Sequence, residues 1–189
     1  MISGYKPTSL QGLLWDPPLD DGDHGRVRNV VGALAERLTA ELVGGRIHKT
    51  DSTASYCPDV SARGVYFESK AVGRSKTAFV YGGRLDKDRQ FAASHRLVYV
   101  IWHHGADSKL AQTESELEAL VLRTMRVLYV VPFAAIDRLC VVPDKLNSKY
   151  GGSDSRPEYG SGYRIPLMYL SRWIHREYTE GYFSNGASS

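Results

Sequence analysis

Apolar positions along the chain recur with two different spacings, which predict one long helix and several strands. Residues 26–43 carry an apolar stripe at helical spacing and end at two glycines, as a helix with a glycine C-cap does. That stripe consists of Val27, Val30, Val31, Leu34, Leu38 and Leu42. Residues 65–72 and 77–81 are strand candidates, and the nearly continuous apolar run at 97–102 predicts a buried central strand.

The remaining pattern adds helices between these strands. Gly82 and Gly83 interrupt the chain before a short helix predicted at residues 85–95. A capping box at residues 113–116 precedes a helix that continues to residue 125, and a strand at 127–131 follows. This order of elements predicts an α/β fold with a mixed β-sheet flanked by helices.

Composition divides the chain into four parts. Residues 1–25 are rich in Pro, Gly and Asp and predict an irregular N-terminal arm, whereas residues 26–142 hold the periodic segments of the core. Residues 143–183 form a C-terminal extension that includes a flexible Gly/Ser loop, and residues 184–189 are expected to be a disordered tail.

Charge and cysteine content limit the class of protein. Hydrophobic residues make up 42% of the chain and charged residues 24%, as in ordinary globular proteins, and the net charge is only +3. Two cysteines outside any C-x-x-C motif favour a reducing cytoplasmic location. Residues 1–12 contain no apolar segment, so we expect no signal peptide, and no apolar run is long enough to cross a membrane.

The positive charge is concentrated in one part of the chain. Between residues 61 and 107 the acidic residues are Glu68, Asp86, Asp88 and Asp107. The basic residues there are more numerous: Arg63, Lys70, Arg74, Lys76, Arg84, Lys87, Arg89 and Arg96. A local basic excess of this kind is typical of a surface that meets a polyanion.

Candidate chemistry lies in the middle of this basic region. On a strand at residues 65–72, alternation places Glu68 and Lys70 on the same face, and Asp59 precedes that strand in a turn after Pro58. Two carboxylates beside one ammonium suit a divalent metal and a water to be deprotonated, which is the chemistry of hydrolytic phosphodiester cleavage. The alternative is a surface ion pair between Glu68 and Lys70 that contributes little.

These residues resemble the motifs of the PD-(D/E)XK nuclease superfamily. Pro58-Asp59 matches its first element, and Glu68-Ser69-Lys70 matches its second. Ala35-Glu36-Arg37 resembles the first helix of archaeal Holliday-junction resolvases, and the likeness covers roughly residues 26–105. The Ile-Pro-x-x-Tyr element at residues 165–169 resembles small dimeric restriction endonucleases. The resemblance implies a restriction-endonuclease-like fold.

The resemblance also implies roles for the candidate residues. Asp59 and Glu68 would hold Mg²⁺, for which Mn²⁺ can substitute, and Lys70 would orient or deprotonate the attacking water. Glu36 would bind the metal directly or through water. The helical-wheel angle instead favours Glu41, which flanks the apolar stripe of the helix. We select Glu36, because a site at the edge of a domain need not lie on the core stripe, and Glu41 is the alternative.

A Mg²⁺-dependent DNA endonuclease acting as a homodimer is therefore the expected function, since cutting both strands needs two sites. The alternatives are a branched-DNA resolvase or phage recombination nuclease, and a catalytically silent DNA-binding module. Phosphate contacts are expected from basic residues after the motif, unless these form only a solvated face: Arg74, Lys76, Arg84, Lys87 and Arg89. The C-terminal loop is a further candidate for DNA contacts.

Three polar residues outside the motif also need an interpretation. Gln90 stands where some members of the superfamily have a site glutamine, or else it is an exposed helix residue. His103 and His104 are adjacent on a predicted strand, so they point to opposite faces and cannot bind one metal together. We expect one of the two histidines to be exposed.

Overall fold

A mixed β-sheet of six strands runs through the protein. The computed structural model describes residues 19, 24–48, 56–140, 162–179 and 181–183. Strands β3 and β5 are parallel, and every other neighbouring pair is antiparallel. In spatial order the strands are β1 (Arg46–Ile47), β2 (Val60–Ala62), β3 (Val65–Val72), β5 (Arg96–His104), β6 (Met125–Pro132) and β8 (Ile174–Glu177).

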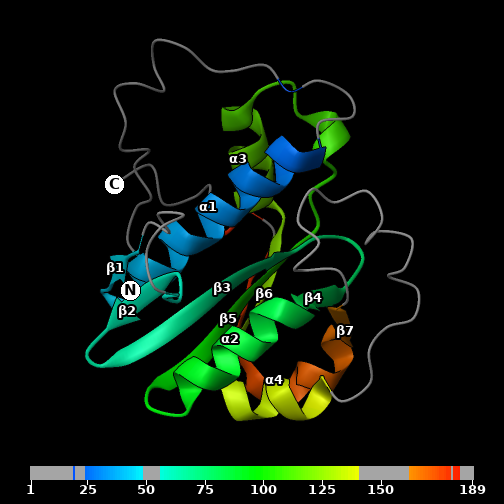
Figure 1. Ribbon diagram of the computed structural model, residues 1–189. Coiled ribbons are helices and arrows are strands. Elements are labelled where there is room, and N and C mark those ends of the chain that lie inside the picture. The colour runs from blue at the N-terminus through cyan, green and yellow to red at the C-terminus, as the bar shows by residue number, and fades with distance from the viewer. Residues whose placement is uncertain (1–18, 20–23, 49–55, 141–161, 180, 184–189) are drawn as a thin grey trace.

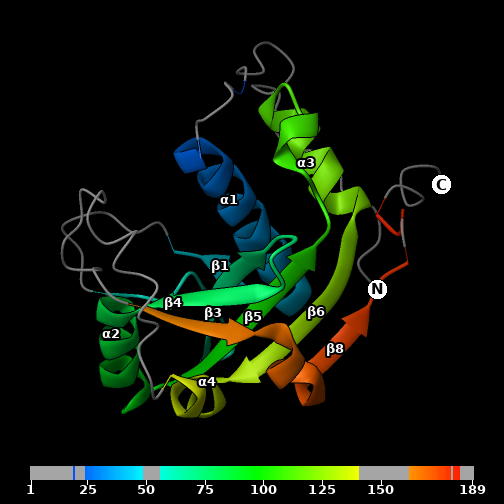
Figure 2. The same cartoon turned by 90° about the vertical axis from the view of Figure 1, so that its right-hand side faces the viewer.

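Helices cover both faces of this sheet. Helices α1 (His24–Val43) and α3 (Glu114–Arg123) pack on one face, as Figures 1 and 2 show. The other face carries α2 (Gly82–Ala92), α4 (Phe133–Leu139) and a two-stranded sheet of β4 (Thr77–Tyr81) and β7 (Gly162–Pro166). Two short 3₁₀ segments complete the described fold, at Ser108–Leu110 and Leu167–Trp173. The predicted α/β architecture with a mixed, helix-flanked sheet is confirmed.

Each face of the sheet has its own apolar core, because successive residues of β5 point to opposite sides. Val100 and Trp102 pack with α1 and α3, whereas Tyr99 and Ile101 pack with α2, α4 and the small sheet. Among the described residues, no helix is both long and apolar enough to span a membrane.

Residues 162–179 are joined to the core by strand pairing. Strand β7 pairs with β4, and β8 adds an edge strand beside β6. The loop for which DNA contacts were expected, together with the predicted arm and tail, lies mostly or wholly outside the described residues.

The β2–β3 hairpin is the local feature on which the candidate site depends. Its two-residue turn consists of Arg63 and Gly64, both with positive φ (50° and 76°), and Ala62 pairs with Val65 to close it. Two successive positive φ values match a type I′ turn, whose twist suits an antiparallel hairpin. Strand β2 is not among the predicted elements, because Arg-Gly is a weaker signal for this turn than Asn-Gly.

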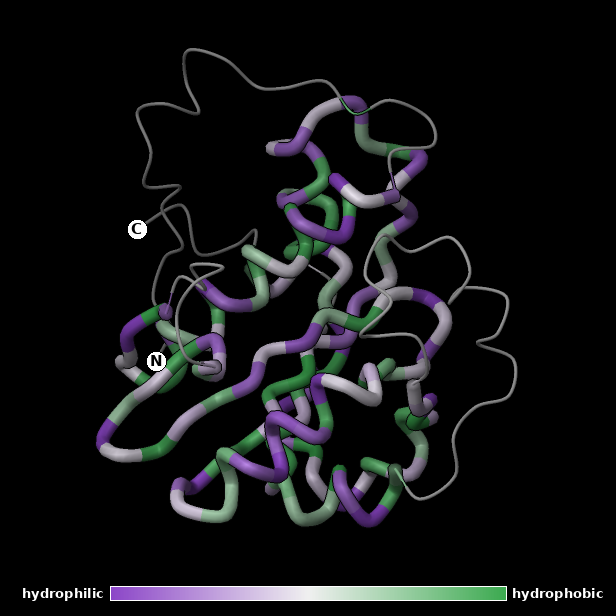
Figure 3. The backbone as a smooth tube through the Cα atoms, viewed as in Figure 1, coloured by the Kyte–Doolittle hydropathy of each residue, from purple (hydrophilic) through white to green (hydrophobic). Residues whose placement is uncertain are grey.

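Helix α2 begins three residues earlier than the sequence predicts. Gly82 and Gly83 form its first residues instead of a break, following Tyr81 in an extended conformation. This start brings Arg84 into the first helical turn. The helix is largely hydrophilic along its length (Figure 3), and Leu85 is its one fully buried apolar residue.

Hydrogen bonds between side chains fix α1 against the sheet. Thr39 is fully buried, and its Oγ1 lies 2.9 Å from Ser69 Oγ on β3 and accepts a bond of 2.9 Å from Trp102 Nε1 on β5. One residue of α1 is therefore tied to both central parallel strands.

Replacing Thr39 with valine should destabilise the protein by about 1–3 kcal/mol, because the Trp102 and Ser69 side chains would lose buried partners. The free energy of unfolding in urea measures this change. Thr179→Val is the matched control, since Thr179 is exposed. An equal loss in both variants would contradict the role assigned to Thr39.

Candidate active site

The hairpin brings Asp59 to the strand that carries the second motif. Val60 pairs with Phe67, so the register continued by one residue places Asp59 opposite Glu68. The carboxylate of Asp59 is held there by a backbone bond, in which Ser69 N donates to Asp59 Oδ2 over 2.7 Å. This bond and the pairing of β2 with β3 together hold Asp59 beside β3.

Glu68 and Lys70 share a face of β3, as alternation along a strand requires. Lys70 Nζ lies 2.5 Å from Glu68 Oε1 and donates a hydrogen bond to it. Glu68 is only 1% exposed, and its second oxygen, Oε2, accepts a bond from Arg84. The alternative of an ion pair on the open surface does not describe this pair, because the carboxylate is buried and bound by two cations.

Arg84 occupies the space between three carboxylates. Besides its contact with Glu68, its Nη2 lies 3.8 Å from Asp59 Oδ1, and its Nε lies 3.7 Å from Asp88 Oδ1. The guanidinium also lies 4.4 Å from the centre of the Tyr56 ring. The side chain is 18% exposed, so this phosphate-contact candidate lies within the carboxylate cluster and is mostly covered.

Asp88 is a functional candidate that is not among the residues predicted from the sequence. It is fully buried and accepts hydrogen bonds from the hydroxyls of Tyr56 and Tyr99. It stands one helical turn after Arg84 on α2, and this i,i+4 spacing was the available signal. Asp88 forms an ion pair with Arg84 but no hydrogen bond to it, and it does not contact Glu68 or Lys70 by any hydrogen bond in the described structure.

The two helix acids lie in different surroundings. Glu36 is half-buried, and its pKa is raised by burial and then by the charge of Glu68, with Lys70 and Arg84 acting in the opposite direction. Glu41 is exposed. Of the two acids, Glu36 is the one that the fold brings into the electrostatic field of Glu68, Lys70 and Arg84.

Burial and mutual charge shift the titration of the central groups. Burial, followed by the charge of Glu68, raises the pKa of Asp59 to about 7, against the lowering effect of Lys70, the Ser69 amide and Arg84. Burial would raise the pKa of Glu68 as well, but Lys70 and Arg84 outweigh it and lower that pKa. Burial favours neutral Lys70, yet Glu68 and Asp59 raise its pKa, so the ammonium stays charged.

The candidate metal ligands are all carboxylates, the ligand type that a hard divalent cation prefers. The carboxylate oxygens would come from Asp59, Glu68 and Glu36. The negative charge of Glu68 raises the pKa of both other acids, and a bound cation would relieve this repulsion between carboxylates. No group of three His, Cys, Asp or Glu side chains within the described residues is gathered closely enough to hold a metal. Arg84 and Lys70 take both Glu68 oxygens, so a metal at Glu68 would have to displace Arg84.

The raised pKa of Asp59 predicts a pH-dependent stability in chelator. The unfolded chain releases this proton near its ordinary pKa of 3.8, whereas the folded protein holds it up to about 7. Stability contributed by the proton is therefore full below pH 3.8 and is lost as pH rises towards 7. Between pH 5 and pH 8, the free energy of unfolding should therefore fall by about 2–3 kcal/mol less in the Asp59→Asn variant than in the unaltered protein.

Urea unfolding at the two pH values measures this difference. Asp86→Asn is the control, because Asp86 is an exposed carboxyl of α2. If Asp59→Asn and the unaltered protein lose the same stability between pH 5 and 8, the assigned pKa of Asp59 is wrong.

The other predicted phosphate contacts lie on the surface. Arg74 pairs with Asp107 at 2.7 Å, and Arg89 pairs with Asp137 at 2.7 Å and with Asp86 at 3.0 Å. Lys76 and Lys87 are exposed and form no ion pair with the residues described, and Gln90 is exposed as well. None of these five residues contacts the carboxylates of the candidate site through a hydrogen bond that the described structure contains.

The prediction for the two histidines was wrong, because His103 and His104 are both buried, at 5% and 7% exposure. The two side chains point to opposite faces of β5, and each face of the sheet is covered by its own core, so both rings are buried. Burial first, and then neighbouring positive charge, lowers the pKa of each, to about 4 for His104, so both rings are neutral.

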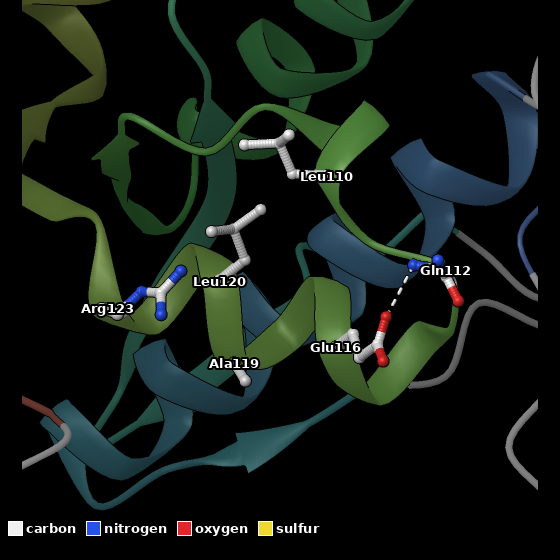
Figure 4. A pocket seen from close by; sticks show the side chains of 6 residues that line it. All are labelled: Leu110, Gln112, Glu116, Ala119, Leu120 and Arg123. Atoms are coloured by element: carbon white, nitrogen blue, oxygen red, sulfur yellow. Dashed lines mark hydrogen bonds between the residues drawn. The ribbon is translucent and has the colours of Figure 1, made fainter.

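A separate pocket of about 550 Å³ lies against α3, on the layer opposite Arg84 and Asp88. Figure 4 shows its walls, in which Gln112 N donates to Glu116 Oε2 over 2.7 Å. The other lining residues are Leu110, Ala119, Leu120 and Arg123, and none of the candidate site residues is among them.

Both cysteines of the chain, Cys57 and Cys140, are free thiols.

Comparison of the chain with protein-family models, with curated proteins and with solved structures gives no match.

Proposed function

We propose that the protein is a Mg²⁺-dependent DNA endonuclease that hydrolyses phosphodiester bonds on a restriction-endonuclease-like core. The observation that carries this proposal is the arrangement at the β2–β3 hairpin, where Asp59, Glu68 and Lys70 come together. The order of elements around it, with a helix before the hairpin and a second helix before a buried parallel strand, agrees with the resemblance of the sequence.

Asp59 and Glu68 would hold the metal, with Glu36 as a direct ligand or as a partner of a metal-bound water. A bound Mg²⁺ would polarise the phosphate and lower the pKa of a coordinated water. The carboxylates are held by the Ser69 amide and by the strand itself, so little reorganisation of the backbone is needed.

Lys70 acts through a retained charge. Because Glu68 and Asp59 raise its pKa, the proton stays on Nζ, which can donate a hydrogen bond to the attacking water or to an equatorial phosphate oxygen. This assigns Lys70 to orientation and charge stabilisation. Of the roles implied by the resemblance, deprotonation of the water suits Lys70 less well.

Incubation with linear, circular and branched DNA, in Mg²⁺ and in chelator, tests the proposal. We expect cleavage in Mg²⁺ or Mn²⁺ and none in chelator. Discrete fragments from linear DNA favour restriction-like cutting, and cleavage confined to a four-way junction favours resolution. Intact DNA of all three kinds in Mg²⁺ would contradict the endonuclease proposal.

Assembly is tested separately. Cleavage of both strands of a duplex requires two sites, so a homodimer is part of the proposal. Sedimentation at the protein concentrations of the cleavage assay should give twice the 21.0 kDa mass of the chain. A monomer that cuts both strands in one binding event would contradict the dimer.

A further inference from the structure

Five rings form a continuous cluster at the end of the sheet where β3 and β5 begin. The centre of the Tyr66 ring lies 4.8 Å from that of Phe91, 5.2 Å from that of His95 and 6.5 Å from that of His48. Phe91 stacks on His95 at 4.4 Å and meets Tyr56 edge-on at 5.8 Å. These five residues, His48, Tyr56, Tyr66, Phe91 and His95, are called the ring cluster below.

The ring cluster adjoins the candidate active site at two points. Tyr66 precedes Glu68 by two positions on β3, so both side chains lie on the same face about 7 Å apart along the strand. Tyr56 lies beneath the Arg84 guanidinium and donates a hydrogen bond to Asp88. A strand whose phosphate reaches Glu68 and Lys70 would therefore pass its neighbouring nucleotide over the ring cluster.

The ring cluster is accessible from solvent. His95 is exposed, and the other four residues are half-buried, in contrast to the fully buried Tyr99 on the same side of the sheet. The β2–β3 hairpin and the connection between α2 and β5 lie at this same end, since Val65 pairs with Arg96 (Figure 1). Part of the surface of these rings therefore faces solvent and is not used in the packing of the core.

Three exposed arginines lie at the same end of the sheet as the ring cluster. Arg46, Arg63 and Arg96 are exposed and form no ion pair with any residue that the structure describes. The segments that build this end of the sheet, residues 44–48, 60–67 and 90–98, contain no Asp or Glu. The charge is complementary to phosphate groups of a nucleic acid.

We propose that the ring cluster and these three arginines bind DNA that has unpaired bases beside the cleaved phosphate. A base in continuous duplex already has both faces stacked on its neighbours, whereas an unpaired base can stack on an accessible protein ring. The inference rests on the proposed function for the place of the phosphate, and it specifies the substrate class as single-stranded or branched DNA.

Fluorescence anisotropy in chelator measures this preference without cleavage. The probes are a labelled single strand, the corresponding blunt duplex, and the same duplex with a single-stranded overhang. The unaltered protein should bind the single strand and the overhang at least about tenfold more tightly than the blunt duplex. His95→Ala and Tyr66→Leu should each weaken single-strand binding about tenfold and duplex binding less than about twofold.

The arginines should act differently from the rings. Arg46→Gln and Arg96→Gln should weaken the binding of all three probes similarly. Each should also make the slope of log affinity against log salt concentration shallower, by about the amount that one phosphate contact contributes. Tyr182→Leu and Arg123→Gln are controls at exposed positions away from the ring cluster, and neither should change binding. His95 is exposed, so its substitution tests the inference even if Tyr66→Leu fails to fold.

Equal affinity of the unaltered protein for single strand and blunt duplex would overturn the inference. So would a His95→Ala protein that binds the single strand as the unaltered protein does, or that loses both kinds of binding equally. These outcomes are independent of cleavage. A protein that cuts duplex DNA in Mg²⁺ but shows no single-strand preference keeps the proposed function and loses only the inference.

Discussion

Replacement of Lys70 by methionine should lower the rate of DNA cleavage in Mg²⁺ by about 10²–10⁴-fold. Methionine keeps much of the length and apolar volume of lysine, but it cannot donate from Nζ or carry the charge that faces Glu68 at 2.5 Å. Binding of the same DNA in chelator should change much less, because the ammonium is engaged with Glu68 and only partly exposed.

Single-turnover cleavage with protein in excess measures the effect on the chemical step. Lys109→Met is the matched control, since Lys109 is exposed and lies near α3, outside the candidate site. Cleavage by Lys70→Met at the rate of the unaltered protein would remove Lys70 from the mechanism. It would also remove the main reason to regard the hairpin as an active site.

Replacement of Arg84 by alanine should destabilise the protein in chelator by about 3–5 kcal/mol. Glu68, which is 1% exposed beside Arg84, would lose one of its two cations, and the fully buried Asp88 would lose the positive charge that lies 3.7 Å away. Removing one partner of a buried ion pair leaves an uncompensated charge, which costs more than the pair contributes.

Divalent cations should reverse part of this loss. Since Arg84 takes the Glu68 oxygen that a metal would need, its removal opens that position, and Ca²⁺ should stabilise the variant more than the unaltered protein. Urea unfolding in chelator and in Ca²⁺ measures both effects. Arg89→Ala, an exposed arginine of the same helix, is the control and should show neither. An Arg84→Ala protein that Ca²⁺ stabilises no more than the unaltered one would contradict displacement of Arg84 by a metal.

The sequence predicted the elements with strong periodicity and the shared face of the motif. The stripe on α1 and the apolar run of β5 indicated the sheet and its covering helix, and the alternation on β3 placed Glu68 beside Lys70. These predictions succeeded because each depends on the repeat of a single element.

The parts that the sequence did not predict depend on turns and on contacts between distant segments. Strand β2 has three residues, too few for a periodic signal, and its turn uses an arginine at positive φ. The basic stretch of the sequence indicated a positive charge at position 84. It did not indicate where the Arg84 side chain points, which depends on the early start of α2 at Gly82. Asp88 was missed because its partners Tyr56 and Tyr99 are 32 and 11 residues away.

The side-chain hydrogen bonds of Thr39 fix which side of α1 faces the sheet. Ser69 stands between Glu68 and Lys70 but points to the opposite face, where it meets Thr39, and Glu36 lies three residues before Thr39 on the same helix. Each residue advances a helix by about 100°. A one-residue insertion between Glu36 and Thr39 would therefore change the direction of Glu36 by about 100° relative to the sheet and to the charges of Glu68, Lys70 and Arg84, with the helix still formed.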